Sequence, residues 1–537
     1  MKNLKILDCT FRDGGYYNAW DFDHQLVKDY MKAMAALPVD TVELGFRYLP
    51  GSSKQFLGAC AYTTDSFLKS IDNRNGIKIA VMVNGIDLIN HKEGIKAAVN
   101  SIFSPADESP VELVRIATHF DKLIEILPAI NQLKELGYKA TINLMQISEL
   151  SYDEIKELAK LTSKFPVDVL YFADSLGSMV QNDVSMTVEA LRTYWKGELG
   201  FHAHNNMEMA LFNVIRAIEH DVTWIDGTVL GMGRGPGNAR TEYLVLELES
   251  IYGIELNHTP LHKLISKYFK PMQDQYKWGS NPFYYMAGKY GIHPTYIQEM
   301  LNDTRYDEED LIAVIHHLKK VGGKKFKPDT LEAARNFFIG KPRGTWNPSE
   351  VIKGRDVLIL GAGPGIERYR QALELFISKN KPYVIALNTQ SGIDVSLIDA
   401  RAACHPIRLL ADCEDHLRLP QPLITPASML PPNIKTIFHD KELLDYGIAV
   451  KENTFCFKAN YCILPTSIVI AYTLAIAASS RVNNIFLAGF DGYGHDDPRN
   501  IEMNNLLYDF QLLENVPEIT AITPTQYKVP TQSIYAM

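Results

Sequence analysis

The first 255 residues alternate short apolar runs with longer helical patterns, and no other feature constrains the fold as strongly. Eight runs rich in β-branched and apolar residues are typical of strands, and each is followed by a helical pattern. Such near-continuous apolar strands are expected where both faces of a parallel sheet are buried. Eight strand–helix units in about 250 residues match a (β/α)8 TIM barrel, although the pattern alone leaves a doubly wound sheet open. The predicted strands are residues 4–9, 41–46, 77–83, 111–117, 139–145, 167–173, 199–204 and 224–230.

Two histidines at the end of the seventh predicted strand give the first functional signal. His202 and His204 are two residues apart, so on a strand both imidazoles face the same side and can reach one divalent metal. Asp13 follows the first predicted strand in DCTFRDGG, and the Gly-rich stretch DGTVLGMGRGPGN, residues 226–238, follows the start of the last. Because the carboxyl ends of barrel strands meet at one face, we expect these residues to form one site.

These motifs occur in the order and spacing of a known enzyme group. DCTFRDGG, VRIATHF, FADSLGSM and the long stretch from FHAHNN to GNARTE resemble the HMG-CoA lyase-like metal-dependent TIM-barrel superfamily. Within it they look most like the 4-hydroxy-2-oxovalerate aldolases, and the similarity covers residues 5–253. The resemblance implies a carbon–carbon lyase that uses Mn2+ or Mg2+. Such an enzyme cleaves or forms the bond between a pyruvate-type enolate and an aldehyde.

The resemblance also implies the metal ligands. Asp13, His202 and His204 would bind the cation. Asn238 stands at the position of the family's Gly-rich-loop Asn, which touches or approaches the metal in some members. A mixed nitrogen and oxygen set without thiolates suits Mn2+ or Mg2+ better than a structural zinc.

Three further residues receive roles in the same way. Arg12 would bind the substrate and stabilise the enolate oxygen, where fixed positive charge meets developing negative charge. Ser175 would lie by the substrate carboxylate, with a helix cap as its alternative role. The valerate aldolases carry an acid–base histidine after the Arg-Asp-Gly motif, whereas this chain has Tyr16 there. We therefore predict that Tyr16 has taken over proton transfer, with a buried structural phenol as the alternative.

Two other functions remain open at this stage. One is an acyl-CoA-dependent 2-oxo acid synthase of the same superfamily, although no CoA-binding feature is evident in the sequence. The other is a non-catalytic barrel that supports a C-terminal glycosyltransferase-like domain. This alternative stays open because Tyr16 stands where the family has its acid–base histidine.

The rest of the chain predicts two further regions. Residues 256–349 are helical and more polar, and we predict a helical subdomain that packs against the barrel and ends in the linker-like segment 340–350, with a lid over the active site as the alternative. Residues 350–537 return to strand–helix alternation, beginning with RDVLILGAGPGIERYRQALELF. The predicted fold is therefore α/β, with a TIM barrel at residues 1–255, a helical connector and a Rossmann-like domain.

A glycine-rich turn opens this C-terminal domain. Gly361, Gly363 and Gly365 would let the backbone approach a phosphate at a helix N-terminus, although a turn without phosphate is the alternative. Asn388 ends the next predicted strand, where an NAD site would carry Asp or Glu. We therefore predict that these four residues bind a nucleotide or nucleotide-sugar other than NAD.

Three C-terminal segments carry a second resemblance. GAGPG, IALN and IFLAGFDGYG resemble the Rossmann-like bacterial sialyltransferases, which bind a cytidine-nucleotide sugar beside a Gly-rich turn and an Asn. Together with an aldolase barrel, this would suit surface-polysaccharide or 2-oxo sugar acid metabolism.

Composition narrows the partners. A net charge of −9 argues against a general nucleic-acid binder. No run of 18 apolar residues predicts a membrane span, and the N-terminus lacks a signal-peptide pattern. Six scattered cysteines without zinc-type spacing are typical of reduced thiols in a cytoplasmic protein. We expect small-molecule substrates and a homo-oligomer.

Overall fold

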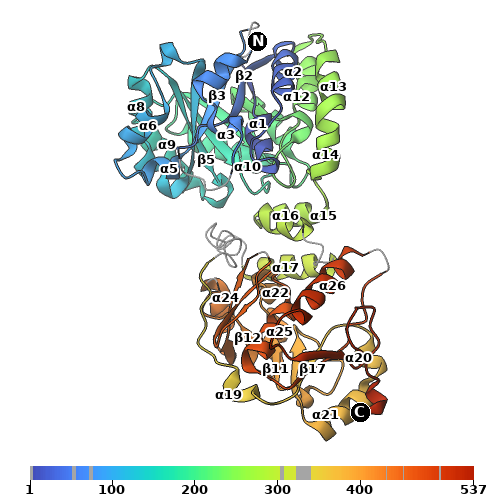
Figure 1. The fold of residues 1–537 in the computed structure, drawn as a ribbon. Coiled ribbons are helices and arrows are strands. Elements are labelled where there is room, and N and C mark those ends of the chain that lie inside the picture. The colour runs from blue at the N-terminus through green and yellow to red at the C-terminus, as the bar shows by residue number, and fades with distance from the viewer. Residues whose placement is uncertain are drawn as a thin grey trace. The chain divides into compact units, whose positions relative to one another are not determined.

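The computed structural model describes residues 4–50, 56–71, 76–302, 308–321, 340–430, 432–451, 453–494 and 497–537. The chain forms two compact units, one up to Glu299 and one from Met300 onward (Figure 1). Each unit is built around its own parallel sheet.

The first unit is a closed barrel of eight parallel strands, in which β1 pairs with both β2 and β8. This confirms the predicted TIM barrel, and it excludes a doubly wound sheet for this region. Its strands are β1 (Lys5–Asp8), β2 (Val39–Phe46), β3 (Lys78–Asn84), β4 (Val111–His119), β5 (Lys139–Met145), β6 (Val169–Asp174), β7 (Glu198–Ala203) and β8 (Trp224–Gly227).

Helices surround the strands of the barrel (Figure 1). Apolar strand residues pack outward against them, while a smaller cluster with Leu7, Leu113 and Tyr171 fills the barrel interior. Burial on both faces explains why the strand sequences are almost continuously apolar. The helices are α1 (Thr10–Gly14), α2 (His24–Ala35), α3 (Ala59–Tyr62), α4 (Asp65–Ser70), α5 (Gly85–Ile89), α6 (Ile95–Ile102), α7 (Leu123–Ile126), α8 (Pro128–Glu135), α9 (Tyr152–Thr162), α10 (Gln181–Arg192), α11 (Ala210–Glu219) and α12 (Thr241–Tyr252).

The helices after the barrel hold its glycine-rich loop. Trp278 Nε1 donates to Leu230 O at 3.0 Å, and the amide of Gly279 donates to Gly235 O at 3.0 Å. Part of the predicted helical connector, residues 303–307 and 322–339, lies outside the described residues, so its boundaries stay predictions. The described helices here are α13 (Thr259–Leu264), α14 (Lys270–Tyr276), α15 (Pro282–Lys289), α16 (Pro294–Asn302) and α17 (Glu308–Val321).

The second unit contains a seven-stranded sheet in the order β13-β12-β11-β10-β9-β17-β18, with every pairing parallel. The chain moves outward from β9 in one direction and later returns to its other side. A ligand crevice is expected where the direction reverses, between β9 and β17. The strands are β9 (Val357–Leu360), β10 (Tyr383–Leu387), β11 (Ala400–Ala402), β12 (Leu423–Thr425), β13 (Leu443–Asp445), β17 (Asn484–Ala488) and β18 (Glu518–Ala521).

A small three-stranded sheet and several helices complete this unit. The predicted linker 340–350 takes part in its fold, because the amides of Thr345 and Trp346 both donate to Asp445 O at 2.9 Å. The remaining elements are β14 (Gly447–Val450), β15 (Cys456–Phe457), β16 (Tyr461–Leu464), α19 (Ser349–Ile352), α20 (Gly365–Arg368), α21 (Arg370–Asn380), α22 (Pro406–Ala411), α23 (Cys413–Arg418), α24 (Pro432–Ile437), α25 (Val469–Ser480) and α26 (Pro498–Gln511).

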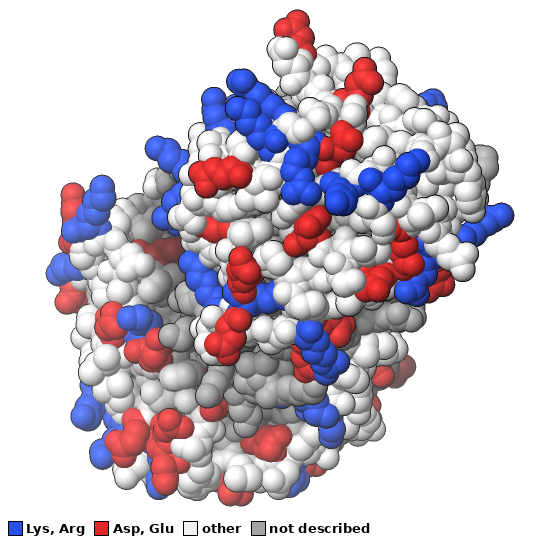
Figure 2. All heavy atoms as spheres, turned by 90° about the horizontal axis from the view of Figure 1, so that it is seen from below, with Lys and Arg blue, Asp and Glu red and all other residues white. Residues whose placement is uncertain are grey.

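Two further observations concern the apolar character of the helices and the charged side chains on the surface. None of the described helices combines the length and apolar character that crossing a membrane requires. On the face shown in Figure 2, basic and acidic side chains are intermixed.

Candidate active site

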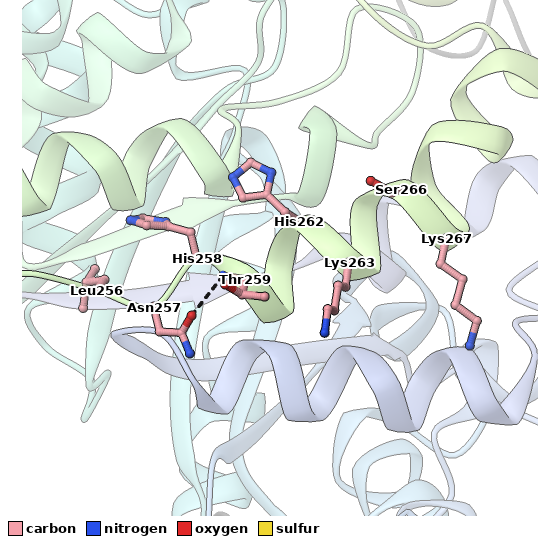
Figure 3. Close-up of a pocket in the computed structure, with 8 residues that line it drawn as sticks. All are labelled: Leu256, Asn257, His258, Thr259, His262, Lys263, Ser266 and Lys267. Carbon is pink, nitrogen blue, oxygen red and sulfur yellow. Dashed lines mark hydrogen bonds between the residues drawn. The ribbon is translucent and has the colours of Figure 1, made fainter.

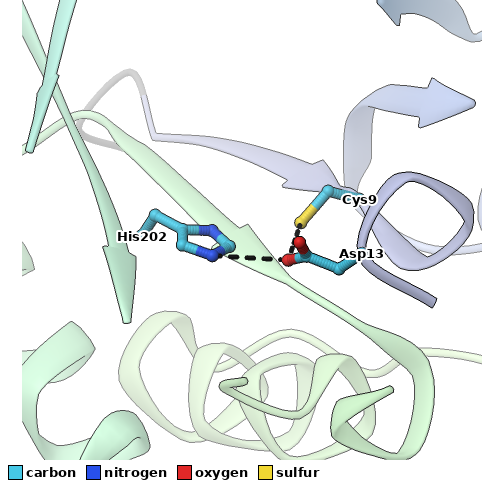
Figure 4. A group of neighbouring side chains, drawn as sticks. All are labelled: Cys9, Asp13 and His202. Atoms are coloured by element: carbon cyan, nitrogen blue, oxygen red, sulfur yellow. Dashed lines mark hydrogen bonds and ion pairs between the residues drawn. The ribbon is translucent and has the colours of Figure 1, made fainter. Parts of the chain in front are cut away.

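Three side chains converge at the carboxyl ends of β1 and β7 (Figure 4). Asp13 lies on α1, directly after β1, and His202 lies near the end of β7. His202 Nε2 is 3.3 Å from Asp13 Oδ2, and Cys9 Sγ is 3.8 Å from the same oxygen. One ligand atom from each residue lies within 4.8 Å of the others, so the group could hold a metal ion.

The other two predicted ligands adjoin this group. The rings of His202 and His204 are 5.1 Å apart between centroids. Asn238 Nδ2 donates to Asp13 Oδ2 at 2.7 Å, and a β-bridge joins His204 to Asn238. The fold therefore brings together all four residues of the predicted metal set. Cys9, which adjoins them, was not predicted, although it belongs to the same motif as Asp13.

Three buried atoms of this set have no hydrogen-bond partner among the described residues. They are His202 Nε2, His204 Nδ1 and Asn238 Oδ1. Each unsatisfied buried polar atom costs about 1–3 kcal/mol. Nitrogen and oxygen atoms beside a carboxylate are also the donors that hard or borderline divalent cations prefer. The residues present therefore fit a divalent metal.

Arg12 is held in place by two carboxylates. Its Nε donates to Glu43 Oε2 at 2.7 Å, and its Nη1 donates to Asp13. Arg115 Nη1 extends the network, donating to the same Glu43 oxygen at 3.2 Å. The Nη2 of Arg12 is buried and has no hydrogen-bond partner among the described residues. This nitrogen is therefore a fixed hydrogen-bond donor that no described protein group uses.

The network closes through β8. Arg115 Nη2 donates to Asp226 Oδ2 at 2.7 Å, and the same oxygen lies 2.8 Å from His202 Nδ1. Because an ionised carboxylate only accepts hydrogen bonds, Nδ1 carries a proton and donates to Asp226, while Nε2 faces Asp13. The six side chains thus form a closed ring: Asp13, Arg12, Glu43, Arg115, Asp226 and His202.

The ring sets the charge of its members and of His204. Burial raises the pKa of Asp13, but the positive charge of Arg12 leads the opposing contributions, which hold that pKa below its usual value. Burial likewise raises the pKa of Asp226, and Arg115 together with His202 brings it below the usual value. Burial and the neighbouring His202 lower the pKa of His204 to about 3. Both carboxyls are therefore ionised and His204 is neutral, as metal ligands must be.

Tyr16 and Ser175 lie around this centre. The ring of Tyr16 packs against Trp20 at 4.7 Å between centroids, and the Arg234 guanidinium lies 4.3 Å from the Tyr16 centroid. The Tyr16 side chain is 40% exposed, which places it at the rim rather than in the core. Ser175 Oγ accepts a hydrogen bond from the amide of Gln146 at 2.9 Å. The chemical roles of Tyr16 and Ser175 stay predictions.

The glycine-rich loop that carries Asn238 is pinned by a phenol. Tyr17 Oη donates to Gly233 O at 3.0 Å and accepts from the amide of Gly235 at 3.1 Å. Gly237 has φ +76°, and a Cβ there would lie 2.1 Å from Gly231 O, so the loop closes on itself only with glycine. The loop therefore presents Asn238 to Asp13 on a fixed backbone.

Three of the four predicted C-terminal residues line a separate cavity of about 720 Å³ in the second unit. Gly361, Gly363 and Asn388 line it, at the switch point of the sheet. The amide of Gly365 donates to Asp491 Oδ2 at 3.1 Å, and a Cβ on Gly363 would lie 2.2 Å from that oxygen. The turn therefore accommodates a carboxylate of the protein itself, and its predicted phosphate contact stays a prediction.

A second depression lies on the outside of the first unit, along residues 256–267 of α13 and its neighbours (Figure 3). It is open and contains none of the predicted site residues.

Known proteins resemble this chain over the barrel. Residues 3–266 match the family model described as HMGL-like. The 4-hydroxy-2-oxovalerate aldolase of Carboxydothermus hydrogenoformans is 28% identical over 331 residues, which is 60% of this chain and 95% of the relative. The enzyme of that name from Geobacillus genomosp. 3 is 32% identical over 254 residues, covering 47% of this chain and 72% of the relative. Among solved structures, the N-terminal domain of a proposed aldolase from Bacteroides vulgatus is 32% identical, covering 56% of this chain and 98% of that one, with a TM-score of 0.51.

Proposed function

This chain belongs to the HMGL-like family, and we propose that its barrel is a divalent-metal-dependent aldolase acting on a pyruvate-type 2-oxo acid and an aldehyde. The observation that carries the proposal is a set of buried polar atoms at the barrel mouth that have no hydrogen-bond partner among the described residues. His202 Nε2, His204 Nδ1 and Arg12 Nη2 are all buried without hydrogen-bond partners among the described residues. Two of these atoms suit a cation, and the third suits an anionic oxygen.

Asp13, His202 and His204 would hold Mn2+ or Mg2+, with Asn238 beside them. When bound, such a cation polarises the 2-oxo group as a Lewis acid and makes the adjacent C–H more acidic. Asp226 and Asn238 keep the ligand side chains oriented, because Asp226 accepts from His202 and Asn238 donates to Asp13.

Arg12 would stabilise the enolate. Glu43 and Asp13 fix two sides of its guanidinium, so Nη2 needs no reorganisation when negative charge develops on the substrate oxygen. Ser175 would contact the substrate carboxylate. Tyr16, at the rim, would donate a proton to the aldehyde oxygen when the carbon–carbon bond forms, and it would take the proton back when the bond is cleaved.

For the second unit we keep the proposal of a nucleotide or nucleotide-sugar site. The support is the position of the 720 Å³ cavity, at the carboxyl ends of β9, β10 and β17 where the strand order reverses. A nucleotide-sugar site and an aldolase in one chain would suit the synthesis or use of 2-oxo sugar acids for a surface polysaccharide.

Metal analysis and isotope exchange test the barrel proposal without requiring the aldehyde. We expect the purified protein to bind Mn2+ or Mg2+ and to exchange deuterium from D2O into the methyl group of pyruvate. A chelator should stop the exchange, and the same cation should restore it. Release of free CoA from acetyl-CoA in the presence of a 2-oxo acid would instead favour the acyl-transfer alternative. Absence of both activities, with no metal bound, would favour the non-catalytic barrel.

A further inference from the structure

We propose that Arg234 selects an aldehyde whose far end carries an anionic group, either a carboxylate or a phosphate. The inference rests on the proposed aldolase function and adds the chemical class of its second substrate. It starts from Arg234, an arginine on the glycine-rich loop that takes no part in the ring of charges.

The backbone around Arg234 is fixed, although its side chain is exposed. The hydroxyl of Tyr17 bonds to the residue on each side, Gly233 and Gly235. The guanidinium lies 4.3 Å from the centre of the Tyr16 ring, a cation–π arrangement that orients its plane. Arg234 is therefore presented to solvent from a defined position rather than from a loose loop.

The charge of Arg234 is not neutralised by the described part of the protein. Arg12 and Arg115 each pair with two carboxylates, whereas no described carboxylate forms an ion pair with Arg234. Arg234 also adjoins this site, because a Cβ on the preceding Gly233 would lie 2.6 Å from Asn238 Nδ2.

The two substrates would bind at different depths in the barrel mouth. The unpartnered atoms of His202, His204 and Arg12 are buried, and the proposed function assigns them to the cation and the 2-oxo acid. The aldehyde then approaches from the solvent side, where Tyr16 and Arg234 lie at the rim. A guanidinium presents parallel N–H donors that match the two oxygens of a carboxylate or phosphate. The far end of the aldehyde is the part of the substrate that reaches it.

Matched aldehyde pairs test this in the full-length protein with Mn2+ or Mg2+ and pyruvate. Butanal and succinic semialdehyde have the same carbon count and differ in a carboxylate, while glyceraldehyde and glyceraldehyde 3-phosphate differ in a phosphate. For wild type we expect kcat/KM to favour at least one anionic member by on the order of tenfold or more, because hydrogen bonds to charged groups are worth about 1.5–3 kcal/mol. Which pair shows the larger preference distinguishes carboxylate from phosphate.

Variants assign the preference to Arg234. Arg234→Gln should lower the ratio of anionic to neutral kcat/KM by about tenfold, mainly through KM, and Arg234→Lys should restore part of it. Arg240→Gln, which removes a guanidinium that contacts Tyr243 on α12, should leave the ratio unchanged. Deuterium exchange into pyruvate by wild type reports on the aldolase function separately. Exchange together with equal ratios in wild type and Arg234→Gln would overturn the inference alone, whereas absence of exchange in wild type would overturn both.

Discussion

The barrel mouth and the C-terminal crevice are built from the same parts, yet their polar atoms are in opposite states. Each has a glycine-rich segment and an acidic side chain at the carboxyl ends of parallel strands. In the barrel, His202 Nε2 and Asn238 Oδ1 are buried without hydrogen-bond partners among the described residues. In the crevice, Asp491 already accepts the amide of Gly365. A motif thus marks where a site can form, whereas buried polar atoms without hydrogen-bond partners indicate that a ligand is required.

The largest expected effect is the loss of a metal ligand. His202→Ala should remove both bound metal and activity, because it deletes the proposed ligand atom Nε2 and the imidazole that pairs with Asp226. His24→Ala, which changes an exposed histidine at the start of α2, is the matched control. Metal content measured by mass spectrometry decides the matter, and full occupancy in His202→Ala would show that the site lies elsewhere.

Loss of the Tyr16 hydroxyl comes next. Tyr16→Phe keeps the ring that packs on Trp20 and should therefore fold and bind metal. Its rate of carbon–carbon bond cleavage should fall by about 100-fold or more, which is the usual contribution of a positioned acid–base group. Tyr243→Phe, on the exposed side of α12, serves as control. A wild-type cleavage rate in Tyr16→Phe would assign proton transfer to another group.

Arg12→Lys should reduce kcat by about a hundredfold while changing KM for pyruvate much less. A lysine keeps the charge, but its single nitrogen cannot replace the planar guanidinium, whose separate nitrogens meet Glu43 and Asp13 and leave Nη2 for the substrate. Steady-state kinetics at saturating pyruvate measure this directly. A change in kcat below about threefold would remove Arg12 from the role of enolate stabiliser.

Asp226→Asn tests whether the ring supports the metal. The amide keeps the shape but removes the charge that Arg115 and His202 share, so metal affinity should fall by about 10- to 100-fold. Asp153→Asn, at an exposed pair with Lys156, should leave affinity unchanged. Metal titration with a competing chelator measures the difference, and equal affinities would reduce Asp226 to a structural residue.

The smallest effect is expected in the crevice. Calorimetry of the full chain with CMP, CDP, UDP and NAD should show binding of a cytidine or uridine nucleotide and none of NAD. If the phosphate approaches the glycine-rich turn, Asp491→Asn should tighten binding by about fivefold or less, because it removes a like charge that is partly exposed. Unchanged affinity would place the phosphate elsewhere in the cavity, and silence from all four ligands would leave the turn a structural feature.

The sequence predicted the strands of the barrel better than it predicted which buried charged side chains pair inside it. The apolar alternation sufficed for eight strands, and the His-x-His spacing and the Arg-Asp-Gly motif placed Asp13, His202 and His204 at one end of them. Arg115 and Asp226 were missed, although a charged residue inside an apolar strand is a signal of a buried pair. Which charges pair depends on how the barrel closes, because Arg115 and Asp226 are 111 residues apart.

The same limit applied to the C-terminal turn. The glycines predicted close approach of another group, and the structure shows that Asp491 is that group, 126 residues beyond Gly365. A local pattern can reveal that space is needed but not what fills it. The predicted nucleotide would have to share the crevice with this carboxylate.

The closed ring of charges at the candidate site cannot be complete until the last strand of the barrel is in place. Its members are supplied in chain order from the first strand to the eighth, and Asp226 arrives only with β8. A nascent chain that ends before β8 would carry Arg115 with a single carboxylate partner and His202 with nothing to fix its tautomer. The proposed metal binding would therefore report on barrel closure as well as on chemistry. Under the proposed function, a misfolded or truncated barrel would lack the complete metal site and would not form the enolate.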